Sequence, residues 1–281
     1  MSKLIRFVSD HKLLYSLRFC PRIVVFALGL VCAATSCKTI PANKSLDVSV
    51  RKVHLDILRA ESRRDAGAEA VQIGLSHHKR NIRLAALKAV SRIESPSSTS
   101  QVLALLGDRD PEVAKWAAFA AGQIGYAQAV SGLVEALSDD SIAKPPVLRA
   151  LGRSATASVA SELYPVLSDE RPKVRGSAAL ALGLIAKRVG AERVKTTTIS
   201  KRLSELVRSK YPADRYGAVY ALMRMPGPDV AASFTSVLAD KNSEIRAMGV
   251  RGLGESGATI QIFDSVIKDP DWKVRYQAVR A

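Results

Sequence analysis

Cysteine is missing from most of this chain of 281 residues: Cys20, Cys32 and Cys37 are the three present, and none follows. Residues 38–281 therefore hold neither an internal disulfide nor a cysteine-ligated zinc site. Aromatic residues make up only 5% of the chain. A core must then be built mainly from alanine, leucine, valine and isoleucine, which favours closely packed helices.

Residues that carry out catalysis are also scarce. Four histidines occur, at positions 11, 54, 77 and 78, and none belongs to a histidine–glutamate pair. The sequence has no glycine-rich phosphate loop, no Ser–His–Asp set at a suitable spacing, and no carboxylate cluster beyond turn residues such as Asp139 and Asp140. Metal and nucleophilic catalysis are not supported. We therefore predict a protein that is not an enzyme and has no cofactor or metal.

Positive charge is abundant, with a formal net charge of +16. This balance permits an anionic partner, whether nucleic acid, lipid headgroups or an acidic protein surface, but it does not require one.

The N-terminal segment has the pattern of an export signal. Residues 23–36 form an uncharged, mostly apolar run that follows Arg18 and Arg22. The run is too short for a typical membrane-spanning helix, which needs about 20 residues, and it fits the apolar part of a secretory signal over residues 1–36. Small residues end the run directly before Cys37 and resemble a bacterial lipobox.

We therefore expect lipid attachment at Cys37, a membrane partner through that anchor, and a location at the outer membrane. A secreted periplasmic protein cleaved near Ser36 and an uncleaved membrane anchor are the alternatives. Residues 37–47 are polar and contain a proline, which is typical of a short tether between the anchor and a folded body.

The remainder, residues 48–281, is repetitive. Its recurring unit is a turn rich in Asp, Pro or Asn, an apolar residue followed by a basic one, and an alanine-rich stretch that closes on Leu-Gly or a similar pair. The apolar position recurs about every 31 residues, except for one interval of 40, at Ile82, Val113, Ala143, Val174, Asp214, Ile245 and Val274. A period of this length built from two helices indicates a stacked helical array.

The predicted architecture is all-α: a right-handed α-solenoid, or superhelix, of about seven two-helix repeats with a partial helix near 48–64. Shorter helices are expected between the copies, at 100–106, 127–137, 159–167, 203–207, 229–238 and 260–267. One helix pair cannot bury its apolar face alone, whereas stacked pairs share a core. The last copy stops at Ala281 inside a helix, so we expect a solenoid truncated at its C-terminus.

Basic residues follow the apolar position in most copies. We expect these residues to form a ladder, either structural, by pairing with turn aspartates Asp110, Asp169, Asp240 and Asp271, or available to a partner. The candidate partner-binding members are Arg175, Arg215, Arg246 and Arg275.

Two further groups are candidates for partner binding. The interval of 40 residues contains a basic insertion around 187–201, with Lys187, Arg188, Arg193 and Lys195. Insertions in solenoids are often functional, although a solvated surface loop is the alternative. The other group comprises exposed or packed side chains near helix starts: Lys115, Trp116, Tyr216 and Tyr220.

These repeats resemble the HEAT family over residues 65–281. Residues 57–65, ILRAESRRD, also look like bacterial exported proteins that carry a cyclophilin-type peptidyl-prolyl isomerase domain after their HEAT repeats. That resemblance implies a recognition arm, and the catalytic domain itself is not in this sequence.

The sequence therefore predicts a non-catalytic envelope scaffold that binds a protein or peptide along a concave face. The alternative is the recognition region of an isomerase or folding factor. The export signal argues against a nucleic-acid partner, and the sequence leaves the oligomeric state open.

Overall fold

The computed structural model describes residues 44–257 and 266–281. Contacts divide the chain into two compact units, residues 1–42 and 43–281, and the described residues belong to the second. The predicted signal segment, Cys37 and most of the predicted helix 260–267 lie outside the described residues.

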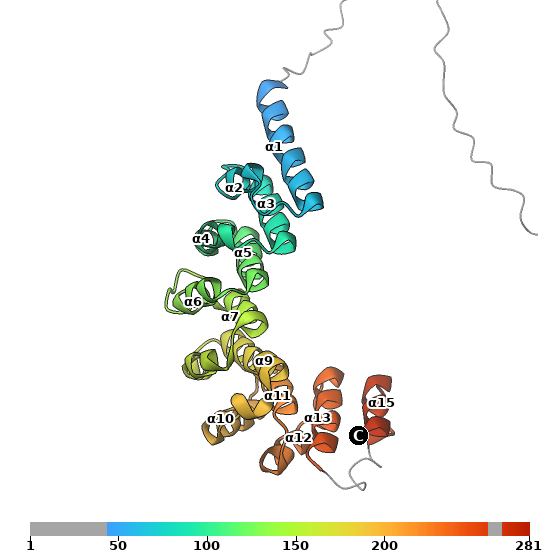
Figure 1. The fold of residues 1–281 in the computed structure, drawn as a ribbon. Helices are drawn as coiled ribbons and strands as arrows, with labels where there is room; N and C mark the ends of the chain where they lie inside the picture. The colour runs from blue at the N-terminus through green and yellow to red at the C-terminus, as the bar shows by residue number, and fades with distance from the viewer. Residues whose placement is uncertain (1–43, 258–265) are drawn as a thin grey trace, which may run out of the picture. The chain divides into compact units, whose positions relative to one another are not determined.

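Two rows of helices make up the second unit. One row holds the long helices of the repeats. These are α1 (Lys44–Arg63), α3 (Arg80–Ile93), α5 (Pro111–Ile124), α7 (Lys144–Ser154), α9 (Pro172–Val189), α11 (Pro212–Arg224), α13 (Ser243–Glu255) and α15 (Trp272–Arg280). Each packs against the next, so that the helices stack in chain order (Figure 1).

Shorter helices form the second row, and each packs against the long helix that follows it. They are α2 (Glu69–Leu75), α4 (Thr99–Ala104), α6 (Ala127–Glu135), α8 (Ala160–Leu163), α10 (Thr197–Val207) and α12 (Ala231–Thr235). Single 3-10 turns accompany them at Pro96–Ser98, Leu105–Gly107, Ala157–Val159, Pro165–Ser168, Ala191–Arg193 and Pro228–Val230. The described residues are thus arranged as stacked helix pairs, which confirms the predicted all-α solenoid.

Helix boundaries follow from local sequence. Asp110 precedes α5 and accepts hydrogen bonds from the backbone N–H groups of Glu112 and Val113, at 3.0 and 3.1 Å. Pro111 is the first residue of the helix, where its missing N–H costs nothing. Gly125 ends the same helix in the left-handed region, at φ 64°, which favours glycine.

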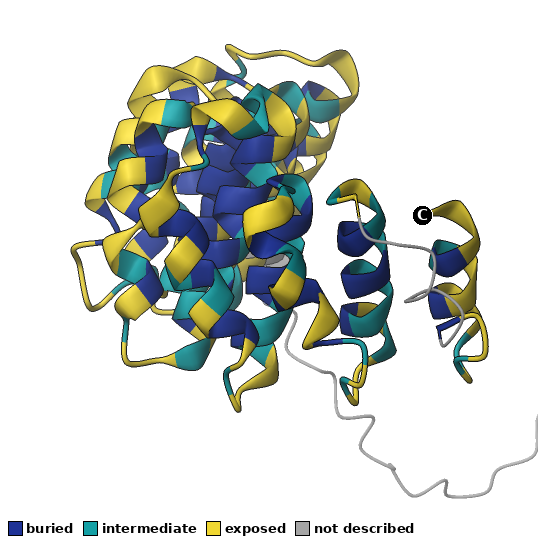
Figure 2. Ribbon diagram, turned by 90° about the horizontal axis from the view of Figure 1, so that it is seen from below, coloured by how far each residue is buried: buried dark blue, intermediate teal, exposed yellow. Residues whose placement is uncertain are grey.

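The core lies between the two rows and consists mainly of alanine, leucine, valine and isoleucine. Figure 2 shows the buried residues concentrated on the facing sides of neighbouring helices. The repeat positions Ile82, Val113, Val174, Ile245 and Val274 are buried as predicted. Ala143 is not, because it precedes the first turn of α7, where the first buried residue is Val147.

Helices α9 and α11 meet backbone to backbone. A Cβ atom on Gly217 would overlap the carbonyl of Gly176, and one on Gly176 would overlap the carbonyl of Ala213. Glycine at both positions therefore allows an approach that any side chain would prevent.

The predicted basic insertion is largely helical. Its first part extends α9 to Val189, a 3-10 turn follows, and α10 begins at Thr197, six residues before the predicted helix at 203. The alternative of a solvated surface loop is therefore wrong for most of this segment. Helix α2 is a second difference, because the repeat spacing did not predict a separate helix there.

Candidate functional site

The basic ladder lies along the starts of the long helices. Five of its arginines donate from Nη1 to one or two main-chain carbonyls of the turn before their own helix, at 2.7–3.1 Å. They are Arg83, Arg175, Arg215, Arg246 and Arg275. Each arginine thereby fixes the turn that positions its helix.

In Arg83, Arg215 and Arg246, another guanidinium nitrogen donates to an aspartate in the turn of the next repeat. Nη2 of Arg83 donates to Oδ1 of Asp108 at 3.0 Å, and Nε of Arg246 donates to Oδ2 of Asp269 at 2.8 Å. Nε of Arg215 donates to Oδ2 of Asp240 at 2.6 Å. Lys144 makes a longer contact with Asp169, 3.9 Å from Nζ to Oδ2, so the ladder links successive repeats as the structural interpretation expects.

The aspartates of the ladder also shape their turns. Oδ1 of Asp269 accepts the backbone N–H of Asp271 at 2.8 Å, and the hydrogen bond from Arg246 is the main cause that lowers the pKa of Asp269. Asp110 and Asp271, which we expected to pair with ladder arginines, are instead N-caps of α5 and α15. The pairing residue stands two positions earlier in each turn.

The ladder is interrupted once, at α5. Ala114 occupies the position of the basic residue. Asp139, 25 residues later like Asp108 after Arg83, accepts hydrogen bonds from the backbone N–H and Oγ of Ser141. The junction between α5 and α7 therefore lacks the ion pair that its neighbours have.

At α11 the ladder is rearranged. Ser209 stands where the other turns have aspartate, and Asp214 stands at the repeat position that is otherwise apolar. Asp214 is completely buried. It accepts hydrogen bonds from Nη2 of Arg175 at 2.6 Å and from Oγ of Ser209 at 2.7 Å. The carboxylate stands at the core position, with Ser209 left at the turn position, and it keeps its arginine partner.

The aromatic candidates are packed at their helix surfaces. Trp116 is half-buried, donates from Nε1 to Glu112 at 3.1 Å and contacts the edge of Phe119. Tyr216 and Tyr220 are also half-buried against the core, and burial is the main cause that raises the pKa of Tyr216. Lys115 is exposed beside Glu112, at 3.4 Å. None of these four residues lines a hollow described below.

The structure separates the basic insertion into two parts. Lys195 is held inside the fold, where its Nζ donates to the carbonyl of Pro226 at 3.2 Å and to Asp229 at 2.8 Å. Arg193 is exposed and lies 3.9 Å from Glu192. Lys187 and Arg188, by contrast, lie at the C-terminal end of α9, beside the hollow that we describe next.

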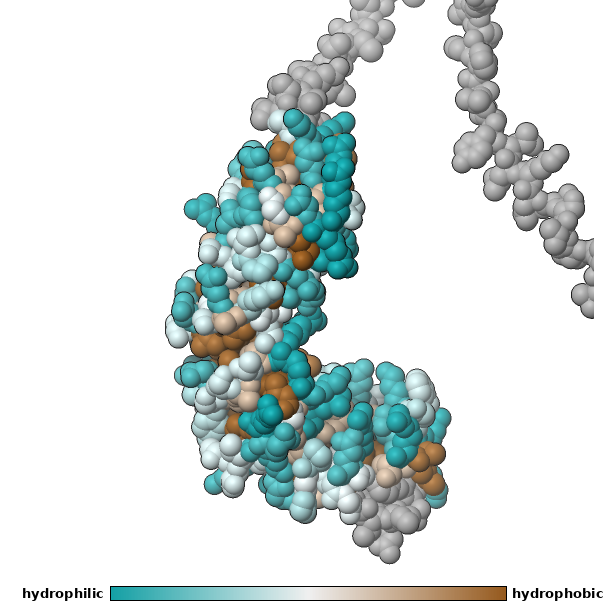
Figure 3. All heavy atoms as spheres, in the orientation of Figure 1, coloured by the Kyte–Doolittle hydropathy of each residue, from teal (hydrophilic) through white to brown (hydrophobic). Residues whose placement is uncertain are grey.

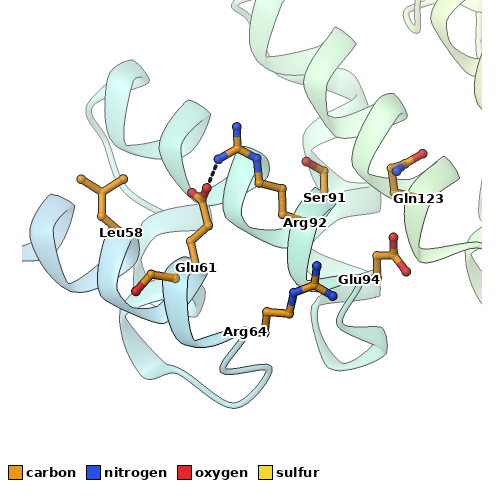
Figure 4. A pocket seen from close by; sticks show the side chains of 8 residues that line it. Leu58, Glu61, Arg64, Ser91, Arg92, Glu94 and Gln123 are labelled. Carbon is orange, nitrogen blue, oxygen red and sulfur yellow. Dashed lines mark hydrogen bonds and ion pairs between the residues drawn. The ribbon is translucent and has the colours of Figure 1, made fainter.

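Two hollows adjoin at the C-terminal ends of α1, α3, α5, α7 and α9, and we call them together the C-terminal groove. The first, of about 490 Å³, is lined by Leu58, Glu61, Arg64, Arg92, Glu94 and Gln123, among others (Figure 4). The second, of about 680 Å³, shares Glu94 and Gln123 with the first, and its lining also includes Arg153, Leu184, Lys187 and Arg188, among others.

The groove is polar at its rim and has small residues along its floor. Gly122, Gly125 and Gly152 line the second hollow. Arg92 reaches across to Glu61 on α1, so that part of the rim is neutral (Figure 4). Hydrophilic residues also predominate on the face drawn in Figure 3, where apolar residues form small separate patches.

Both non-glycine residues with positive φ among the described residues, Arg64 (φ 52°) and Glu94 (φ 60°), lie in this groove. Glu94 ends α3 in the conformation for which α5 uses Gly125. Left-handed backbone costs a non-glycine residue about 1–2 kcal/mol, and such strain tends to be kept at functional positions. The groove is therefore the candidate site.

The described residues bear on metal binding and on membrane spans. Within residues 44–257 and 266–281, no group of three His, Cys, Asp or Glu side chains is placed to hold a metal ion. None of the helices described is both long and apolar enough to cross a membrane.

Comparison with known proteins identifies the family. The HEAT repeats family matches residues 68–144 and 199–281, more than half of the chain. The chain belongs to the HEAT-repeat family. No match was found among curated protein sequences.

The chain is also similar to solved structures. An engineered protein is 18% identical, with a TM-score of 0.51 over 83% of this chain and 72% of its own. An archaeal HEAT-like repeats protein from Thermococcus onnurineus NA1 is 15% identical over 83% of this chain and 94% of its own, with a TM-score of 0.42. A designed armadillo repeat protein is 21% identical over 74% and 95%, with a TM-score of 0.41. The first shows a shared fold and no more.

Proposed function

We propose that this HEAT-repeat chain is a non-catalytic scaffold and that its protein partner binds in the C-terminal groove. The observation that carries the proposal is the groove itself, which is contributed by the ends of five successive long helices. Grooves across stacked repeats let a scaffold contact an extended length of partner. The fold is compatible with protein binding, and the groove supplies a specific surface for it.

The ladder supports this choice of surface. Arg175, Arg215 and Arg246 have their donors engaged with carbonyls and carboxylates inside the fold. A partner that bound them would have to break those hydrogen bonds, leaving buried polar groups unpaired. At the groove, Arg153 and Arg188 contact a ring and a carbonyl instead of a carboxylate, so an anionic partner would break no ion pair there.

A displayed library of random peptides, selected on the full chain, tests the proposal. Gln123 lies at the junction of the two hollows, so we expect Gln123→Trp to fill the groove and abolish binding of the selected peptides. Gln128→Trp on α6, in the row of short helices, is the matched control because Gln128 is exposed away from the groove. Peptides that bind both variants equally would show that the groove is not the binding surface.

For location, the proposal is export followed by lipid attachment at Cys37, with the HEAT solenoid at the outer membrane or in the periplasm. It rests on the apolar run at 23–36 and the small residues before Cys37. We expect a palmitate analogue to label the wild type and Cys32→Ala but not Cys37→Ala. Equal labelling of all three would contradict the anchor.

A second candidate function is the recognition region of a peptidyl-prolyl isomerase or folding factor. It rests on the resemblance of residues 57–65 to exported proteins of that kind. The coding sequence that follows Ala281 tests it, since a cyclophilin-type domain in frame would support it and a stop codon would contradict it.

A further inference from the structure

Four cations at the C-terminal groove have no carboxylate partner among residues 49–257 and 266–281: Arg64 lies in the first hollow, and Arg153, Lys187 and Arg188 lie together in the second. Arg188 donates from Nη1 to the carbonyl of Ser154 at 3.0 Å, and Arg153 lies over the ring of Phe119, 4.8 Å from its centroid. Lys187 is exposed beside them. By contrast, Arg92 in the first hollow and Arg251 on α13 are paired with glutamates.

The side chains of Arg153 and Arg188 are held in place without neutralising their charge. Phe119 is itself braced by Trp116, with 5.3 Å between ring centroids, so the aromatic pair supports Arg153 from below. The hydrogen bond to Ser154 fixes Arg188 across the junction between α7 and α9, and burial lowers its pKa. A positioned cation without a counter-ion is suited to an anionic ligand.

We infer that the C-terminal groove binds an extended, acidic segment of a partner protein, with its carboxylates over Arg153, Lys187 and Arg188. This inference rests on the proposed function and gives the partner its chemistry. The charges differ along the second hollow: its cations come from α7 and α9, whereas Glu94 comes from α3. An acidic segment is therefore oriented, with its acidic end at α9.

Polypeptide fits this groove better than nucleic acid. Glu94 is exposed and can accept backbone N–H groups, and the amide of Gln123 can both donate and accept. A phosphodiester backbone offers no such donor and would be repelled by Glu94. The lining residues of the two hollows also include no aromatic side chain on which a base could stack.

The groove sets the length of the segment. Packed helices lie about 8–10 Å apart, so the three steps from α3 to α9 span about 24–30 Å. An extended chain advances about 3.3 Å per residue, which corresponds to a segment of roughly eight or nine residues.

The test uses two labelled peptides of about nine residues. One has aspartates at one end, and the other has asparagines in their place. Binding to the full chain is followed by fluorescence anisotropy at low and at physiological salt. Exposed ion pairs contribute about 0.2–1 kcal/mol each, so three contacts should make the aspartate peptide bind about tenfold more tightly, less so at higher salt.

A charge-neutral variant and a matched control locate the effect. The triple variant Arg153→Gln, Lys187→Gln, Arg188→Gln should lose the preference for aspartate. The control triple variant Arg193→Gln, Lys201→Gln, Arg208→Gln, which removes the same charge nearby but outside the groove, should keep it.

Several outcomes would overturn the inference. If both peptides bind alike and Gln123→Trp abolishes both, the groove binds peptide without charge selection, and only the proposed function survives. Failure of the aspartate peptide to bind at low salt, or a preference retained by the groove triple variant, would remove the acidic ligand. Competition by a single-stranded oligonucleotide of equal charge would point to nucleic acid instead.

Discussion

The exchange between Ser209 and Asp214 makes a quantitative prediction. Asp214 is fully buried and accepts from Arg175 at 2.6 Å and from Ser209 at 2.7 Å. Asp214→Val removes a charge-assisted hydrogen bond of about 1.5–3 kcal/mol and a neutral one of about 1 kcal/mol. Burial of the valine returns about 1–2 kcal/mol, so we expect a net loss of about 2 kcal/mol.

Ser209→Asp alone should also destabilise, because its carboxylate would stand against that of Asp214, and like charges at this separation cannot both ionise cheaply. Together, however, the two changes recreate the arrangement at Asp240 and Ile245, with aspartate in the turn and an apolar residue in the core. We expect the double variant to recover to within about 1 kcal/mol of wild type, because an aspartate at 209 could again pair with Arg175.

Thermal unfolding followed by far-ultraviolet circular dichroism measures the cycle. For a domain of this size 1 kcal/mol shifts Tm by about 2–4 °C, so Asp214→Val should lower Tm by about 4–8 °C. Because repeat arrays can unfold in steps, whole melting curves are compared. If the Tm of the double variant falls by the sum of the two single losses, the reasoning is refuted, because positions 209 and 214 would then not be alternative places for one carboxylate.

Three other variants test the ladder and the helix packing. Ala114→Arg should pair with Asp139 and stabilise by about 0.5–1 kcal/mol in chemical unfolding, with no gain when Asp139 is replaced by alanine. The hydrogen bond from Arg171 is the main cause that lowers the pKa of Asp169 from 3.8 to about 2. A carboxylate whose pKa is lowered in the folded state stabilises the fold at pH values above its unfolded pKa, and this stability is lost as pH falls toward about 2. Asp169→Asn should therefore flatten the dependence of the free energy of unfolding on pH between about pH 4 and 2. An unchanged slope would contradict this. Gly217→Ala should cost about 1–3 kcal/mol through overlap with α9, whereas Gly107→Ala, which meets nothing within 4 Å, should not lower Tm.

The fold could be predicted from sequence because the signal repeats. Most copies contain the apolar position, the basic residue and the alanine-rich stretch. A copy that departs from the pattern can therefore still be aligned by its spacing from the others. Ala143 shows the limit: the period assigns it to the core, but the two prolines that follow start α7 there and leave it exposed. Local turn chemistry overrode the period at that copy.

Pairings within the ladder were harder to predict. Both Asp108 and Asp110 stand in the same turn, and only the geometry shows that Asp108 pairs with the ladder residue Arg83, while Asp110 caps α5 and pairs with Arg80 outside the ladder. The departure at Asp214 was visible in the sequence, but its compensation by Ser209 was not, because the longer interval before α11 breaks the 25-residue spacing that would have aligned the two turns.

The candidate groove was the least predictable feature. It takes three or four residues from the end of each of five long helices, and these small sets are about 30 positions apart, so they form no motif. Lys187 and Arg188 were found through the insertion, whereas Arg153 and Glu94 were not. A usable signal was the basic last turn of several long helices, although cations are expected there for helix-dipole reasons alone.

The missing ion pair at Ala114 has a mechanical consequence. A stack in which each repeat touches only its neighbours bends most easily at its weakest junction. Among the described long helices from α3 to α15, the junction between α5 and α7 is the one without a ladder ion pair, whereas the junctions on either side have one. The groove crosses that same junction, since Glu94 lies on one side of it and Lys187 on the other. A segment bound along the groove would therefore bridge this junction and reduce its bending, so the scaffold would be more rigid when bound than when free.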